Sequence, residues 1–136
     1  MIDEITYKEN RKDGFSKFFD KQGCLKGISS YSENVKFGEE KLFYNSGRIK
    51  NINNYLQNKK HGFCYELDSL GRVITISEYV GGFLRSEEKI NRLDEEQKKH
   101  GIWKEFHENG KIKWEGDFKH GILNGIVREY NKKGGL

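Results

Sequence analysis

The segment GIWKEFHENGKIKWEGDFKHGILNG, residues 101–125, indicates the fold most clearly because its glycines are regularly spaced. Gly101 and Gly125 lie 24 residues apart, and Gly110 follows Gly101 after nine residues. Between the glycines, apolar and charged residues alternate as they do in a half-buried β-strand. A phosphate-binding glycine loop would instead join an apolar strand to a helix. The segment therefore predicts two short strands separated by turns.

The same spacing recurs along the chain. Leading glycines at positions 14, 38, 62, 101 and 125 are separated by 24, 24, 39 and 24 residues. A second glycine follows each of them after nine residues, and an aromatic residue follows four of them after seventeen. Columns of this kind identify an array of one repeated unit. The residues to which we assign structural roles are Gly14, Gly23, Gly38, Gly47, Gly62, Gly71, Gly101, Gly110, Gly125, Tyr31, Tyr55, Tyr79 and Phe118.

Each unit reads as two strands and two turns. In the first turn, as in YNSGR at 44–48, a type I turn followed by a left-handed glycine fits the spacing. The second turn holds Asn10, Asn34, Asn58, Gly82 or Gly121, the residue types that best tolerate a left-handed backbone. The predicted fold class is therefore all-β. We expect an elongated, single-layer antiparallel β-meander of about five and a half 24-residue units. It forms one domain over 1–136, with units starting near 14, 38, 62, 101 and 125 after a partial unit at 1–13.

The turn type also predicts which residues face each other across a hairpin. The fifth residue after the leading glycine faces the eleventh, so Phe19 faces Leu25, Phe43 faces Ile49 and Phe106 faces Ile112. The first residue then faces the fifteenth, which pairs a large side chain with a small one. These pairs are Phe15 with Ser29, Phe63 with Ser77, and Ile102 with Gly116.

Fifteen extra residues interrupt the period within about 80–97. The segment is highly charged, and Ile90 and Leu93 are spaced by three, as on one side of a helix. We expect a solvated loop or a short helix. The alternative is a lid or an arm that contacts a partner, because insertions in repeat proteins often lie on the binding face.

One face of the sheet is expected to change along the chain. Ile28, Ile52 and Ile76 form an outward column that Glu115 continues, and on that face Phe18 and Leu42 give way to Glu66, Glu105 and Glu129. Early units should thus be apolar on both faces and late units on one. A second apolar face needs a cover, which is the insertion, a second molecule or a different partner.

Composition and chemistry indicate a binding protein. Hydrophobic and charged residues are each 34%, aromatic residues are 13%, and the net charge is +4. Cys24 and Cys64 lie two units apart, too far for a disulfide, so we expect free thiols. No histidine has metal-ligand spacing, and no acidic pair has an apolar pocket that would tune it for catalysis. We expect a cytoplasmic protein with no catalytic residue, no metal, no cofactor and no enzyme activity.

One column favours recognition. Lys17, Lys41, Tyr65, Lys104 and Arg128 each stand three residues after a leading glycine, and we expect them on the same face as the aromatic residues. Such a basic ladder suits an acidic protein surface, phospholipid head groups or nucleic acid. Ordinary solvated strand residues are the alternative, because Glu and Asp are interspersed. These five residues are the candidate partner-binding site.

Columns of the form G-x-W-x-x-F-x-x-x-G-K-I-x-x-x-G-x-F-x-x-G-x-x-x-G, as in 101–125, resemble MORN repeats (membrane occupation and recognition nexus). They are most similar to the bacterial variant in antitoxin proteins of the YwqK type. Earlier units differ, because the position of Trp103 holds Ser16, Glu40 or Cys64. The resemblance covers Tyr7 to Leu136 and implies a single-layered antiparallel sheet with a binding role.

Two functions follow as expectations. The first is an antitoxin or immunity-like module that sequesters a protein partner, such as a toxin, on a sheet face. The second is a scaffold or surface-associated interaction protein that contacts anionic lipid weakly. Nucleic acid is the less favoured partner. At the end of the given sequence, the strand at 126–130 has one unpaired edge, which suits a homodimer, fraying beyond Asn131 or a longer natural chain. An apolar face offers a second route to a homodimer.

Overall fold

The computed structural model describes residues 3–8 and 11–135. Every strand pairing in it is antiparallel, and no helix occurs among these residues. The prediction of an all-β antiparallel meander is therefore confirmed. In the same residues, no helix long and apolar enough to cross a membrane is found.

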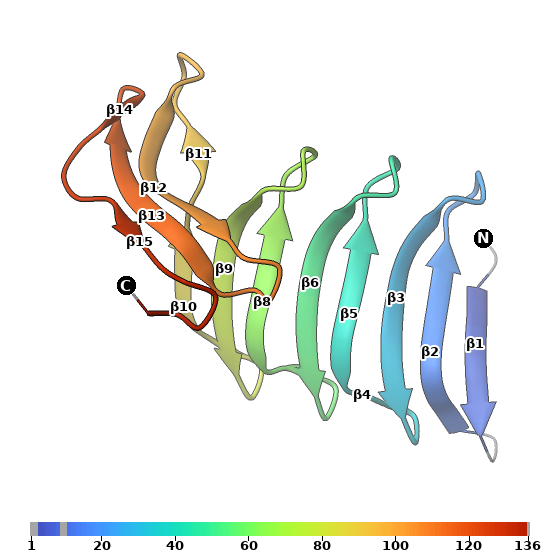
Figure 1. Ribbon diagram of the computed structural model, residues 1–136. Helices are drawn as coiled ribbons and strands as arrows, with labels where there is room; N and C mark the ends of the chain where they lie inside the picture. Colours follow the sequence, from blue (N-terminus) through green and yellow to red (C-terminus); the bar gives the residue numbers. More distant parts are fainter. Residues whose placement is uncertain (1–2, 9–10, 136) are drawn as a thin grey trace. The chain divides into compact units, whose positions relative to one another are not determined.

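The strands group into two compact units, which divide at Glu88 and Lys89 inside the insertion. The prediction of a single domain stays a prediction, and each unit is described by itself. The sheet of the first unit follows the order β1-β2-β3-β5-β6-β8-β9-β10, so that each main strand lies beside the next one along the chain (Figure 1). Its strands are β1 (Asp3–Lys8), β2 (Arg11–Phe19), β3 (Leu25–Ser32), β4 (Val35–Lys36), β5 (Gly38–Phe43), β6 (Ile49–Leu56), β7 (Lys59–Lys60), β8 (Gly62–Leu67), β9 (Val73–Val80) and β10 (Phe83–Lys89).

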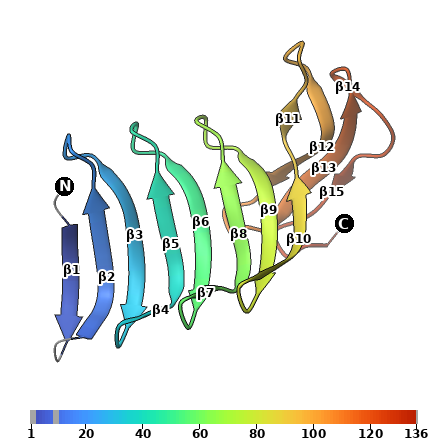
Figure 2. The ribbon, with the colours of Figure 1, turned by 180° about the vertical axis from the view of Figure 1, so that it is seen from behind.

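The sheet of the second unit repeats the same plan on a smaller scale. Its order is β11-β12-β13-β14, and β15 pairs with β13 beyond the short β14. Seen from behind in Figure 2, the short strands β4 and β7 connect successive hairpins of the first unit. The strands of the second unit are β11 (Arg92–Leu93), β12 (Lys99–Phe106), β13 (Ile112–Lys119), β14 (Ile122–Leu123) and β15 (Arg128–Glu129).

The turns have the predicted chemistry. Gly47 has a φ of 89° and Gly110 a φ of 85°, so both occupy the left-handed region expected after a type I turn. In the second turns, Asn34 and Asn58 are left-handed as predicted, and the residues before them, Glu33 and Gln57, are left-handed as well. Two successive positive φ angles define a type I′ hairpin turn. Gly82 and Gly121 are left-handed too, whereas Asn10 lies outside the described residues.

The register differs from the prediction by one residue over most of each hairpin. Phe19 faces Leu25 as expected, but Phe18 faces Gly27, so the second strand holds one extra residue at Lys26. This β-bulge recurs in every hairpin of the repeat, with a register shift at the same place. The predicted pairs beyond it are therefore wrong. Phe15 faces Ser30 instead of Ser29, Phe63 faces Glu78 instead of Ser77, and Ile102 faces Asp117 instead of Gly116.

Because of the bulge, the column of Ile28 and the column of Phe18 lie on different faces of the sheet, contrary to the prediction. Ile28 pairs with Lys17, whereas Phe18 pairs with Gly27, and neighbouring residues of a strand point to opposite faces. Ile28 and Phe18 therefore lie on opposite faces, not on one. The second face of the first unit is not apolar, because its buried side chains include Ser16, Ser29, Glu40 and Asn53.

The insertion is neither a loop nor a short helix. It forms β10 and β11 and a tight turn at 94–98, so that prediction is wrong. The carboxylate of Asp94 accepts hydrogen bonds from the Glu96 and Lys98 amides, as Asp68 does from Leu70 and Arg72 in a regular first turn. Gln97 has a φ of 64° and takes the place of the glycine.

At the far end of the second unit, the predicted turn forms between Asn131 and Gly135, with Gly134 left-handed. The strand before it is shorter than predicted, because only Arg128 and Glu129 pair with β13. Ile126, which was predicted to belong to this strand, lies before it and is 78% exposed.

The core is thin. Buried apolar side chains among the described residues are Cys64 in the first unit and Ile90 and Trp103 in the second. In each sheet, the stabilising burial arises mainly between neighbouring strands, which is typical of repeat proteins.

Candidate functional site

A row of side chains crosses six strands on one face of the first sheet. Residues directly opposite each other on paired strands share a face, and the pairing is continuous from β2 to β9. Lys41 faces Ile28 on one side and Ile52 on the other, and Tyr65 lies between Ile52 and Ile76 in the same way. We call this set the lysine–isoleucine row: Lys17, Ile28, Lys41, Ile52, Tyr65 and Ile76.

The second sheet has the same row with a different composition. Lys104 faces Glu115, and Glu115 faces Arg128. The Lys104 Nζ lies 3.6 Å from a Glu115 carboxylate oxygen, and an Arg128 guanidinium nitrogen lies 3.8 Å from the other. The Tyr130 hydroxyl donates to the same carboxylate at 2.9 Å. Glu115 thus compensates the two cations that the sequence predicted as binding residues.

The five predicted partner-binding residues therefore divide into two groups. Lys17, Lys41 and Tyr65 lie together in the first unit, whereas Lys104 and Arg128 lie in the second. Lys41 forms an exposed ion pair with Glu39 at 3.4 Å.

The expectation that the ladder shares its face with the aromatic residues is wrong for the tyrosine column. Tyr31 pairs with Gly14, three residues before Lys17, so by strand alternation the two side chains occupy opposite faces. Phe15 and Phe63 do share the face of the row, and they are 61% and 49% exposed.

The other face of the first sheet holds a buried polar cluster around Glu40. The Glu40 carboxylate accepts a hydrogen bond from Ser29 Oγ at 2.8 Å and one from Asn53 Nδ2 at 3.2 Å. Lys36 Nζ lies 2.5 Å from the same carboxylate and 4.4 Å from the centre of the Tyr55 ring. Burial alone would raise the pKa of Glu40, but the hydrogen bonds from Lys36, Ser29 and Asn53 outweigh it and hold the pKa below its ordinary value.

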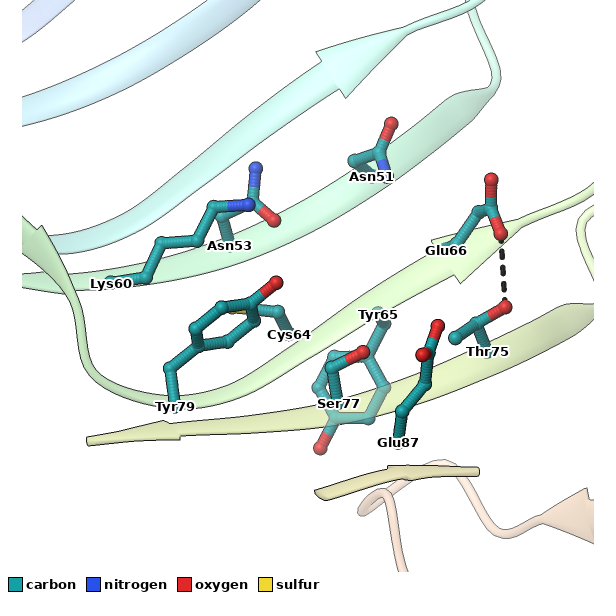
Figure 3. A pocket seen from close by; sticks show the side chains of 10 residues that line it. All are labelled: Asn51, Asn53, Lys60, Cys64, Tyr65, Glu66, Thr75, Ser77, Tyr79 and Glu87. Carbon is teal, nitrogen blue, oxygen red and sulfur yellow. Dashed lines mark hydrogen bonds between the residues drawn. The ribbon is translucent and has the colours of Figure 1, made fainter. Parts of the chain in front are cut away.

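One repeat further along, the same face contains a hollow of about 170 Å³. Figure 3 shows Lys60, Asn53 and Tyr79 at one end and Glu66 with Thr75 at the other. The Thr75 hydroxyl donates to the Glu66 carboxylate at 2.9 Å, and the Lys60 ammonium lies 5.0 Å from the centre of the Tyr79 ring. The residues that line the hollow are Asn51, Asn53, Lys60, Cys64, Tyr65, Glu66, Thr75, Ser77, Tyr79 and Glu87.

Sequence reasoning missed this hollow, although its signal was visible. The position two residues after the leading glycine holds Glu40, Cys64 or Trp103 in otherwise similar units, and we interpreted the change as loss of the repeat pattern. A lysine precedes each of these leading glycines by two residues, at positions 36, 60 and 99.

Cys24 and Cys64 are free thiols, as predicted. Within the ranges 3–8 and 11–135, no group of three or more His, Cys, Asp or Glu residues is arranged to hold a metal ion.

Two comparisons with known proteins gave no match. No family model matches the chain, and no curated protein matches it significantly. The resemblance to MORN repeats stays a prediction.

Proposed function

We propose that the protein is a non-enzymatic protein-binding module that holds its partner on the lysine–isoleucine row. The observation that carries this proposal is the continuous pairing of Lys17, Ile28, Lys41, Ile52, Tyr65 and Ile76 across six strands. A sheet face that combines apolar side chains with cations suits a partner with exposed apolar groups and carboxylates.

The exposure of the row supports binding by contact. Ile28, Ile52 and Ile76 are half-buried, and Phe15 on the same face is 61% exposed. Exposed apolar groups in an ordered patch are typical of interaction sites. Following the resemblance to antitoxin proteins, we infer an immunity-like role in which the sheet sequesters a toxin.

A second candidate function is contact with anionic lipid. The observation that favours it is the presence of exposed Phe15 and Phe63 on the same face as Lys17 and Lys41, since aromatic and cationic groups together suit a charged membrane surface. In this case the protein is a surface-associated scaffold.

Co-purification with charge variants tests the proposal. The tagged protein is isolated from its source cells as the wild type, as Lys17→Glu/Lys41→Glu and as Lys104→Glu/Arg128→Glu. We expect the first variant to lose the bound protein and the second to retain it, because Glu115 already compensates Lys104 and Arg128. The product of a neighbouring gene is the first partner to examine by the same comparison with purified components.

Equal retention of the partner by all three proteins would contradict the row as the binding surface. Sedimentation with vesicles of phosphatidylglycerol and phosphatidylcholine, compared with phosphatidylcholine alone, separates the lipid alternative. Sedimentation that requires phosphatidylglycerol and is lost in Lys17→Glu/Lys41→Glu would favour that second function.

A further inference from the structure

Three equivalent lysines in the repeat have three different environments. Lys36, Lys60 and Lys99 each lie two residues before a leading glycine. Lys36 and Lys60 are on the short strands β4 and β7, which connect two hairpins, whereas Lys99 begins β12. The partner of each lysine is set by the side chain two residues after that glycine. It is the Glu40 carboxylate for Lys36, and the Trp103 ring, 4.7 Å from the ammonium, for Lys99.

At Lys60 the same position holds Cys64, whose side chain is too short to reach the ammonium as a carboxylate would. Cys64 is 5% exposed and lies in the hollow described above. In the described part of the chain, no carboxylate forms an ion pair with Lys60, which contacts the Tyr79 ring. The hollow is therefore the space that a glutamate at this position would fill.

The groups that bind the Glu40 carboxylate all have counterparts around the hollow. Ser29, Asn53 and Lys36 surround Glu40, and one repeat later the same register places Asn53, Ser77 and Lys60 around Cys64. Ser77 pairs directly with Cys64, as Asn53 pairs with Glu40. A serine hydroxyl, an amide and an ammonium are hydrogen-bond donors for an anion.

We propose that this hollow binds the carboxylate group of a ligand at the place that corresponds to the Glu40 carboxylate one repeat earlier. Lys60 and Ser77 donate to the two oxygens, Asn53, whose Nδ2 already donates to Glu40, lies beside them, and the wall of the site is the Tyr79 ring (Figure 3). The volume of about 170 Å³ is ample, because one water needs only about 10–15 Å³. Lys60 and Ser77 lie on the face opposite to the lysine–isoleucine row, and Tyr65 of the row borders the hollow. The site does not depend on the function proposed for the row.

The acidic end of the hollow determines which carboxylates fit. Glu66 and Glu87 line that end, so a second negative charge on the ligand would meet like charges there. The site should therefore prefer a ligand with one carboxylate over a dicarboxylate. A free small acid and the side chain of an aspartate or glutamate in a protein both satisfy this chemistry.

Titration with acetate, monitored by nitrogen-15 NMR at constant ionic strength against chloride, tests the proposal. We expect saturable shifts of the Cys64 and Ser77 amides and the Asn53 side-chain amide, and weaker binding of succinate. Lys60→Met should weaken acetate binding about tenfold, the usual effect of a charged hydrogen bond. Lys59→Met is the matched control and should bind as the wild type does.

Cys64→Glu provides the converse experiment, since it supplies the missing carboxylate from the chain itself. It should abolish acetate binding, while Cys64→Ser, which keeps the hollow open, should retain it. Tighter binding of N-acetylglutamate amide than of acetate would identify a protein side chain as the ligand, and equal or weaker binding a free acid. Unchanged affinity in Lys60→Met, or acetate binding that survives in Cys64→Glu, would overturn the proposal, as would shifts that never saturate.

Discussion

The first and second units use one backbone plan and fill it differently. In the first unit, Cys64 leaves a polar hollow beside Lys60, whereas in the second unit Trp103 fills the equivalent position and packs edge-on against Phe118 with ring centres 6.4 Å apart. Lys99 lies 5.0 Å from the same Phe118 ring. The glycines and turns fix where this position is, and its side chain decides whether the result is a binding site or a small core.

The opposite face shows the same principle. Ile52 separates Lys41 from Tyr65 in the first unit, but Glu115 separates Lys104 from Arg128 in the second. A basic column in the sequence is therefore a charged surface only where the intervening residue is not acidic.

The largest effect is expected at the position that differs most. Trp103→Ala removes a side chain that is 7% exposed and should destabilise the second unit by about 3–5 kcal/mol, the range for large aromatic truncations. Cys64→Ala at the equivalent place should cost about 1 kcal/mol, because little volume is lost. Urea unfolding combined with amide exchange in each sheet measures both, and equal costs would contradict the contrast.

Glu40→Gln should destabilise the first unit by about 2 kcal/mol, because the charged hydrogen bonds with Lys36 and Ser29 are weakened in a buried cluster. The exposed Glu39→Gln is the matched control, with a loss below about 1 kcal/mol. Urea unfolding at neutral pH gives both values. Similar losses in the two variants would show that the cluster around Glu40 contributes little.

The stabilisation by Glu40 should depend on pH. The pKa of Glu40 in the folded protein lies below its ordinary value of 4.5, so the folded state favours the ionised form. Its contribution is therefore complete above pH 4.5 and is lost as the pH falls through the folded pKa. The difference in unfolding free energy between the wild type and Glu40→Gln should shrink on acidification below 4.5. If the difference instead grew on acidification, the pKa of Glu40 would be raised in the folded protein and not lowered.

Turn substitutions should give smaller effects of opposite sign in the two units. Gly47→Val places a β-branched residue at a φ of 89° and should cost about 1–2 kcal/mol. Gln97→Gly relieves a non-glycine residue at a φ of 64° in the corresponding turn of the insertion and should stabilise by up to about 1 kcal/mol. Thermal unfolding of the two variants measures both changes in stability. A Gly47→Val variant as stable as the wild type would contradict the turn assignment.

The smallest effect on stability is expected from the basic residues. Lys17→Glu/Lys41→Glu should change the unfolding free energy by less than about 1 kcal/mol, because exposed ion pairs such as Lys41 with Glu39 contribute little. Lys104→Glu/Arg128→Glu should cost more, since it surrounds Glu115 with like charges. Thermal unfolding compares them, and the reverse order would show that Glu115 does not compensate the second group.

Much of the fold was predictable because the period appears directly in the sequence. The glycines and asparagines of the turns have special backbone angles, and their spacing gives the strands and the antiparallel order. The register was not predictable to the residue. A period of 24 counts residues along the chain, and a bulge at Lys26 leaves that count unchanged while it moves Ser29 from opposite Phe15 to opposite Ser16.

The insertion and the hollow escaped prediction for different physical reasons. All seven residues of β10 are exposed, so the segment lacks the alternation that identifies a half-buried strand. The turn at 94–98 has Gln97 at the left-handed position where the regular turns have glycine, so the glycine spacing does not indicate this turn. The hollow arises from residues of five strands, β6 to β10, and from a single change from Glu40 to Cys64 between units. Only the correct register shows that Asn53, Ser77 and Lys60 surround the changed position.

Interstrand contacts around Cys64 are the decisive measurement for the two faces of the sheet, because the assignment of each face depends on the bulge. We predict nuclear Overhauser effects that link the side chain of Cys64 with those of Asn53 and Ser77, and the ring of Tyr65 with Ile52 and Ile76. Contacts of the Cys64 side chain with Ile76 would instead place the isoleucines on the face of the hollow. That result would contradict the sorting of the two faces and with it both proposed sites.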